Sequence, residues 1–182
     1  DVLIEDNSLY IGHEPSSTAE YNVAVGVTAL EAITTGNNNT AVGYNALTAN
    51  TSGKENTAIG RNALSSLNPS DSSTESIGNV AIGMDTLTNL TTGTYNIAIG
   101  KDVGETITTG KKNIIIGYGE PSASNASNQI IIGEEAVGHG DNILVIGGSG
   151  SNGGNYQLSS WEPGSDNYTS LGSADHSFKD AY

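Results

Sequence analysis

Aromatic and planar polar side chains gather near the C-terminus in a pattern that suits sugar binding. Three aromatic residues, Tyr156, Trp161 and Tyr168, fall within thirteen residues of one another. An aromatic ring stacks on the apolar face of a sugar, while amides and carboxylates bond to its hydroxyls. We predict a ligand-binding tip whose contact residues are Tyr156, Trp161, Tyr168, Gln157, Asp166 and Asn167. Alternatively, Trp161 plugs the end of a repeat stack, which must be capped.

Other groups that carry chemistry give weaker patterns. The cluster with metal-ligand character is Glu134, Glu135, His139 and Asp141, but a solvated acidic corner explains it more simply, so we predict no metal site. A relay triad needs residues from separate segments, whereas Asp175, His176 and Ser177 are consecutive. No carboxylate pair is singled out for glycoside hydrolysis. We therefore predict no catalytic residue, no cofactor and no enzymatic activity.

A glycine-rich segment at 148–153, GSGSNG, matches the dinucleotide-binding pattern G-x-G-x-x-G. That pattern works only when a helix follows and presents its N-terminus to a pyrophosphate. The stretch that follows here, GNYQLSSWEPGSDN, is typical of loops. We interpret the segment as a flexible neck in front of the tip.

A five-residue phrase repeats along most of the chain and defines the elements that must position the tip. Its copies are NVAVG at 22–26, NTAVG at 39–43, NTAIG at 56–60, NVAIG at 79–83, NIAIG at 96–100 and NIIIG at 113–117. The closing glycines follow one another at steps of 17, 17, 23, 17 and 17 residues. Degenerate copies end at Gly12, Gly133 and Gly147 and raise the predicted number of coils to nine. Such a short period predicts a solenoid of stacked units.

Each coil is expected to hold two short strands and two turns. The first strand is the apolar triplet, and the second lies in segments such as YNAL at 44–47, before a break such as TSG at 51–53. The 23-residue step contains six extra residues within a segment rich in Ser, Asn, Pro and Asp at 65–73. We predict a surface loop there that leaves the stack unbroken.

The apolar triplet has two apolar faces, because successive side chains of a strand point to opposite sides. We assign the column containing Val25, Val42 and Ile59 to the interior of the coil. A strand that is apolar on both faces indicates a further layer, so we predict that the other column forms a contact between chains. That column is Ala24, Ala41, Ala58, Ala81, Ala98, Ile115, Ile131 and Val145. The alternative is a monomer whose small alanines tolerate exposure.

A row of asparagines precedes the triplets at Asn22, Asn39, Asn56, Asn79, Asn96 and Asn113. We expect stacked amides that bond along the solenoid and cap turns, rather than a row of ligand contacts.

Charge and composition exclude several classes of function. The chain has 182 residues with 6 basic and 20 acidic side chains, a net charge of −14. Nucleic-acid binding requires clustered Lys and Arg, so we expect no such partner. There is no cysteine, and no apolar stretch is long enough for membrane insertion. The chain starts at Asp1 without a signal peptide or an initiator methionine, so we expect a fragment of a longer protein.

The repeat resembles the head repeats of trimeric autotransporter adhesins and the NTAIGxNAL repeats of phage tail fibres and related bacterial fibres. The resemblance covers roughly residues 8–147, although the 17-residue period departs from the shorter adhesin repeat. It implies a left-handed parallel β-roll in which three chains lie side by side around one axis.

The C-terminal segment SLGSADHSFKDAY at 170–182 resembles the segment that precedes the intramolecular chaperone domain of phage tailspikes and fibres. The matching residues are Leu171, Gly172, Ser173, Lys179, Asp180 and Tyr182. The resemblance implies a transient C-terminal chaperone, and either a mature fibre end from which that chaperone has been removed or a chain cut before the chaperone.

Together these patterns predict an all-β protein: a lead-in coil at 1–21, a left-handed parallel β-roll (β-solenoid) shaft at 22–147 and a small irregular or β-structured tip at 148–182, assembled as a homotrimer. The expected function is non-enzymatic adhesion of an extracellular fibre to a cell-surface receptor, a glycan above all. The fibre belongs to a phage tail or to a bacterial surface. The alternatives are a polysaccharide-degrading tailspike and a purely structural spacer.

Overall fold

A computed structural model describes residues 2–5, 8–11, 18–69, 77–121, 123–138, 140–150, 154–156, 172–173 and 176–177. These described residues form strands and turns and contain no helix. Accordingly, they include no helix of the length and apolarity that a membrane span requires.

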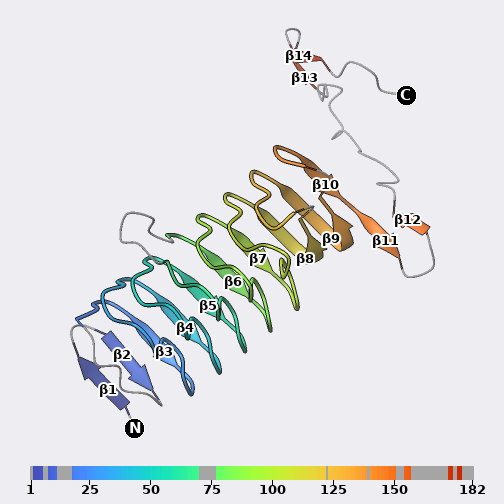
Figure 1. Cartoon of the computed structure of the whole chain (residues 1–182). Helices are drawn as coiled ribbons and strands as arrows, with labels where there is room; N and C mark the ends of the chain where they lie inside the picture. The colour runs from blue at the N-terminus through green and yellow to red at the C-terminus, as the bar shows by residue number, and fades with distance from the viewer. Residues whose placement is uncertain are drawn as a thin grey trace, which may run out of the picture.

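Ten strands form one sheet whose order follows the chain, as the stacked coils in Figure 1 show. They are β1 (Val2–Glu5), β2 (Ser8–Ile11), β3 (Val23–Val25), β4 (Thr40–Val42), β5 (Thr57–Ile59), β6 (Val80–Ile82), β7 (Ile97–Ile99), β8 (Ile114–Glu120), β9 (Ile130–Val137) and β10 (Leu144–Ile146). Strand β1 pairs antiparallel with β2. All later neighbours pair in parallel. The predicted parallel β-solenoid is confirmed.

Two small antiparallel sheets follow the solenoid. One consists of β11 (Gly148–Gly150) and β12 (Gly154–Tyr156), and the other of β13 (Gly172–Ser173) and β14 (His176–Ser177).

The stack keeps one register from coil to coil. Ala41 of β4 pairs with Ala58 of β5, and Ala58 pairs in turn with Ala81 of β6. The second pairing spans the 23-residue step, so the insertion does not interrupt the sheet, as predicted. The backbone of Lys54 also bridges to Ile77 just beyond the insertion. Residues 70–76, which hold most of the predicted loop, lie outside the described residues.

The regular coils contain one strand each, and the second strand predicted around residues 44–47 is wrong. That segment is a turn, because Asn45 and Leu47 adopt left-handed backbone angles, with φ of 57° and 52°. Its backbone still bonds to both neighbouring coils, through Asn45 N to Val27 O at 3.2 Å and Leu47 N to Ala63 O at 3.0 Å. These bonds between coils offset the strain of left-handed non-glycine residues.

The two faces of the strands are opposite to our assignment. The alanines are buried in the interior of their own chain, within one hydrophobic core that also holds the leucines of the turns. The column runs along the whole core: Ala24, Ala41, Ala58, Ala81, Ala98, Ile115, Ile131 and the partly buried Val145. The leucines, represented by Leu47 and Leu64, leave little room behind the strand, so a methyl group is the side chain that fits. The prediction that this column contacts another chain is therefore corrected.

The asparagine row confirms the expected structural role. In the repeating pattern, Asn39 Nδ2 donates to Asn22 Oδ1 at 3.1 Å and to Gly53 O at 2.9 Å. The same Asn22 Oδ1 accepts the backbone N–H of Asn39 at 2.8 Å. Buried amides thus satisfy one another and the turn backbone along the stack.

The glycine that closes each triplet allows neighbouring coils to approach. A Cβ on Gly26 would lie 2.7 Å from the carbonyl oxygen of Gly43, and Gly26 has a φ of 135°. Both the contact and the backbone angle exclude an ordinary side chain at this position.

Candidate functional site

The predicted tip residues fall almost entirely beyond what the structure describes. Tyr156 is the last residue of β12, while Gln157, Trp161, Asp166, Asn167 and Tyr168 lie outside the described residues. Their role in ligand binding therefore stays a prediction.

The acidic cluster near the end of the solenoid is a set of exposed or structural carboxylates. Glu134 and Glu135 are exposed on β9, and Asp141 Oδ1 accepts the backbone N–H of Ser127 at 2.8 Å. His139 lies outside the described residues. In the part of the chain that the structure describes, no three residues of metal-ligand type converge.

The most extensive surface feature is the outward face of the sheet β2–β10, which we call the outer face. It consists of the first and third residues of each triplet, because the middle residue points into the core. The first column is Leu9, Val23, Thr40, Thr57, Val80, Ile97, Ile114, Ile130 and Leu144. The second column is Ile11, Val25, Val42, Ile59, Ile82, Ile99, Ile116, Ile132 and Ile146.

These side chains are in substantial contact with solvent. The exposed fraction is 36% for Ile82, 37% for Ile99 and 57% for Leu144. Their column neighbours are half-buried or exposed throughout the described coils. Sequence reasoning missed this surface because it placed the same residues in the interior.

Two rows of residues border the outer face. The N-side rim precedes each strand by two residues and consists of Tyr21, Asn38, Glu55, Gly78, Tyr95, Lys112, Asn128 and Asn142. The C-side rim follows each strand by two residues and consists of Val27, Tyr44, Arg61, Met84, Lys101, Tyr118 and Glu134. For β8 and β9 these positions are counted from the paired triplets that begin each strand. Apart from the half-buried Gly78 and Met84, all rim residues are exposed.

Backbone bonds between coils hold the N-side rim in place. Its members have φ near +60°, and from Asn38 onward each backbone N–H donates to the preceding coil. Glu55 N bonds to Asn37 O at 3.0 Å, and Tyr95 N bonds to Ile77 O at 3.0 Å. The backbone of the rim is thus held at fixed positions, from which its side chains project at each coil.

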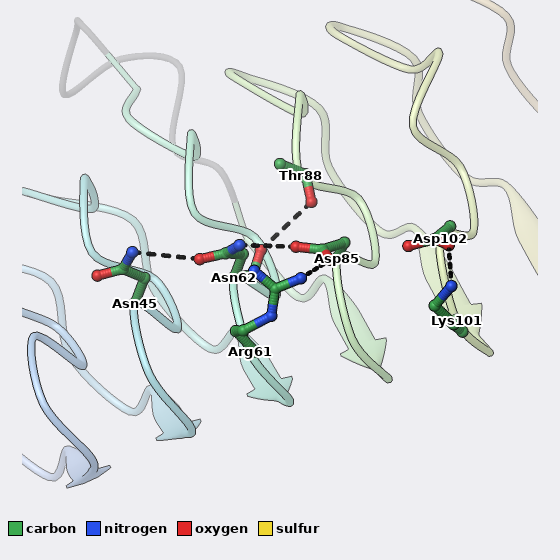
Figure 2. A network of polar contacts seen from close by, with 7 residues as sticks. All are labelled: Asn45, Arg61, Asn62, Asp85, Thr88, Lys101 and Asp102. Atoms are coloured by element: carbon green, nitrogen blue, oxygen red, sulfur yellow. Dashed lines mark hydrogen bonds and ion pairs between the residues drawn. The ribbon is translucent and has the colours of Figure 1, made fainter.

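A polar ladder follows the turn just after the C-side rim (Figure 2). Asn45 Nδ2 donates to Asn62 Oδ1 at 3.2 Å, and Asn62 Nδ2 donates to Asp85 Oδ1 at 2.7 Å. Arg61 pairs with the other carboxylate oxygen of Asp85. The Arg61 side chain remains 51% exposed, so this ion pair contributes little stability by itself and leaves other N–H groups of the guanidinium in solvent.

The ladder becomes more charged toward the C-terminal coils. Lys101 Nζ lies 2.8 Å from Asp102 Oδ2, and the hydrogen bond and charge of Asp102 raise the pKa of Lys101. Glu120 accepts hydrogen bonds from the backbone N–H groups of Glu105 and Thr106, both at 3.0 Å. Partial burial, and then the charges of Asp102 and Glu120, raise the pKa of the Glu105 carboxyl. This corner joins neighbouring coils through bonds among its own residues.

Comparison of the chain with protein-family models, with curated proteins and with solved structures finds no match. The features of this chain that bear on its function are therefore the solenoid, its outer face and the composition of the C-terminal segment.

Proposed function

We propose that this chain is the end of a non-enzymatic, extracellular fibre: a left-handed, homotrimeric solenoid shaft that carries a receptor-binding tip at 148–182. The single observation that supports the fibre best is the in-register stack of nine parallel strands with an apolar outer face. A stack that grows by one coil at a time produces length, and its repeated face suits assembly of several copies along that length.

The tip is proposed as the binding site because the two regions differ in composition. Described shaft positions repeat Asn, Thr, Ala and Gly, whereas the tip combines Tyr156, Trp161 and Tyr168 with amides and carboxylates. The ligand class that this composition fits is a cell-surface glycan. Three tips around one axis would also convert weak single-site binding into avidity.

The test compares cell binding by the full chain with binding by a chain truncated after Gly147. Two further variants are Tyr156→Ala and Tyr168→Ala, and the control is Asn89→Ala, which removes an exposed side chain from a turn of the shaft. We expect truncation and both tip variants to reduce binding, while the control binds normally. Oligomeric state is measured first for each variant, so that lost avidity is not mistaken for a lost site.

Undiminished binding by the truncated assembly would place the receptor site on the shaft and contradict this assignment. Absence of binding by any form on a glycan array and on cells would favour a structural spacer. Release of shortened chains from a surface polysaccharide would favour a tailspike-like hydrolase instead. A transient chaperone partner predicts that co-expression with such a domain raises the yield of the assembled form.

A further inference from the structure

The apolar area of the outer face is too large for the surface of an isolated chain. Eight of its eighteen positions are 36–57% exposed and the other ten are half-buried, so at roughly 40 Å² for each position the face presents on the order of 700 Å². The largest apolar patch of a typical soluble monomer covers roughly 300–600 Å². A stable interface takes about 800 Å² from each partner. The outer face therefore has the area of one complete interface.

Length and regularity indicate what covers this face. The face is a straight double column that repeats at every coil from β2 to β10, so its partner must present matching apolar groups at the same repeat. Among the described residues, the exposed large apolar side chains that recur at that repeat belong to the outer face and its rims, and a second copy therefore supplies the matching surface. Self-complementarity of this kind is the usual basis of homo-oligomers.

The rims determine how copies are arranged. When copies are related by rotation about an axis parallel to the stack, the N-side rim of one copy approaches the C-side rim of the next at the same coil. At the coil of β5 this brings Glu55 to Arg61, an opposite-charge pair. At the coil of β7 it brings Tyr95 to Lys101, and at that of β8 Lys112 to Tyr118, both suited to cation–π contact.

Other levels add no conflict to this arrangement. Asn38 meets Tyr44 at the coil of β4, and Asn128 meets Glu134 at that of β9. None of the described levels places two like charges together. Two like charges placed together across an interface would cost on the order of several kcal/mol, which would disfavour a register that brought them together.

We infer that the outer face is buried by two further copies of this chain in a closed, parallel ring, with equal coils level and with Glu55 of each copy beside Arg61 of the next. This inference rests on the proposed fibre and identifies the surface and register of its assembly. In a ring of three copies, the outer faces are inclined to one another, so the rims of neighbouring copies meet. In a dimer, the two outer faces would lie parallel and about 10 Å apart, which would keep the rims from meeting.

The same pair cannot form within one chain. Because Thr57–Ile59 are extended, the four residue steps from Asn56 to Gly60 span about 13 Å at roughly 3.3 Å per residue, and Glu55 and Arg61 lie beyond those two ends. A disulfide needs Cα atoms closer than about 7 Å. Because the chain has no cysteine, introduced cysteines report contacts between copies without background.

The first experiment oxidises the full chain carrying Glu55→Cys and Arg61→Cys and counts the linked chains on a denaturing gel. The expected product is a covalent trimer that reverts to single chains on reduction. Neither single variant should give it. A variant with Glu55→Cys and Lys112→Cys tests antiparallel stacking, which would bring N-side rims together. Cross-links from that variant, or a dimer from the first, would overturn the parallel ring.

The second experiment tests the apolar face by sedimentation at micromolar concentration. Ile99→Glu changes a side chain that is exposed in the single chain, so the coil should still fold, as judged by circular dichroism. We expect it to shift the trimer to monomer. The control is Thr109→Glu. Thr109 is exposed in a turn of the same coil, away from the outer face, and this variant should remain trimeric.

A wild-type chain that sediments as a monomer would overturn the inference, and so would a trimer that Ile99→Glu leaves intact. Failure of the proposed adhesion gives a different result. In that case the trimer and its cross-links are found, but neither cells nor glycans are bound. The two failures are therefore distinguishable.

Discussion

At Gly104 and Ile115, the large and the small side chain of the earlier coils have exchanged positions across the interior of the solenoid. A Cβ on Gly104 would lie 2.7 Å from Leu87 Cδ2 and 3.3 Å from Ile115 Cδ1. In earlier coils, leucines such as Leu87 occupy the turn position of Gly104, and alanines such as Ala98 occupy the strand position of Ile115. The larger strand residue thus fills the space that the missing leucine leaves, and the change from Ala to Ile along the column is a change of core packing.

This exchange predicts strong coupling between the two positions. Ile115→Ala should lower the free energy of unfolding by about 2–5 kcal/mol, because it leaves a cavity. Adding Gly104→Leu to that variant restores the pattern of the earlier coils and should recover most of the loss, since Leu87 tolerates a similar positive φ. Gly104→Leu alone should destabilise, because it overpacks the core. Urea denaturation of the four proteins gives the coupling energy, and additive effects would contradict the exchange.

Substitution by leucine should affect the two adjacent strand residues Ala58 and Ile59 to different extents. Ala58 is fully buried, whereas Ile59 is 39% exposed. Ala58→Leu should cost about 1–3 kcal/mol of stability, because the core has no room for the added atoms. Ile59→Leu keeps the side-chain volume and should change stability by less than about 0.5 kcal/mol. Equal effects in thermal unfolding would mean that the two faces of the strand are not distinguished by packing.

The amide ladder makes a separate prediction. Asn79 Nδ2 donates to Asn56 Oδ1 at 3.0 Å and to Gly93 O at 2.9 Å, and Asn79 Oδ1 accepts the backbone N–H of Asn96 at 3.0 Å. Asn79→Ala leaves several buried groups without partners, at a cost of about 1–3 kcal/mol for each. The control is Asn89→Ala, because the exposed Asn89 bonds to Glu105 O at 2.8 Å where water can replace it. A similar loss in both variants would show that burial of the ladder contributes nothing.

Much of this fold follows from the sequence because the repeat fixes it at every coil. The period located each triplet strand, the steps between closing glycines located the insertion, and Asn22 and its equivalents were assigned to a structural ladder. The assignment of the two faces is wrong because the alternation of side chains along a strand separates two faces without indicating which of them lies in the interior. One available signal was Thr40 and Thr57, whose hydroxyls suit an outward column better than an interior one.

The second strand and the functional surface were harder to predict for physical reasons. The YNAL segment has strand-like composition, but left-handed angles at Asn45 and Leu47 depend on bonds from neighbouring coils, which a local pattern does not contain. The rim pairs, such as Glu55 with Arg61, become visible once the outward column is known. The predicted tip depends on composition alone, since its binding residues carry no repeat that would fix their positions.

The insertion after β5 should be dispensable for stacking. In the sequence, residues 70–76 stand where the preceding coil has Gly53 alone, because Pro69 corresponds to Ser52 and Ile77 pairs with Lys54. Replacing 70–76 by a single glycine should change the free energy of unfolding by less than about 1 kcal/mol, because loop-closure entropy varies slowly with length. Thermal unfolding and sedimentation measure the outcome. Loss of the assembled state would identify the insertion as an assembly element.

The carboxylates around Glu105 predict an unusual dependence of stability on pH. The pKa of Glu105 is raised in the folded chain, first by desolvation and then by the charges of Asp102 and Glu120. A carboxyl with a raised pKa binds its proton more tightly in the folded state. Its contribution is therefore favourable at low pH and is lost as pH rises through the unfolded and then the folded pKa.

Glu105→Gln removes that penalty and should raise the thermal midpoint at pH 7. The difference from the wild type should shrink as pH falls and vanish below the ordinary glutamate pKa of about 4.3. The matched control is Glu31→Gln, which removes the same charge from an exposed position in another coil and accounts for the general effect of net charge. Because the Glu105 side chain is largely exposed, the expected gain is small and should diminish in high salt. A midpoint that falls on Glu105→Gln at pH 7, or a gain equal to that of Glu31→Gln at every pH, would show that this corner does not disfavour the ionised carboxylate.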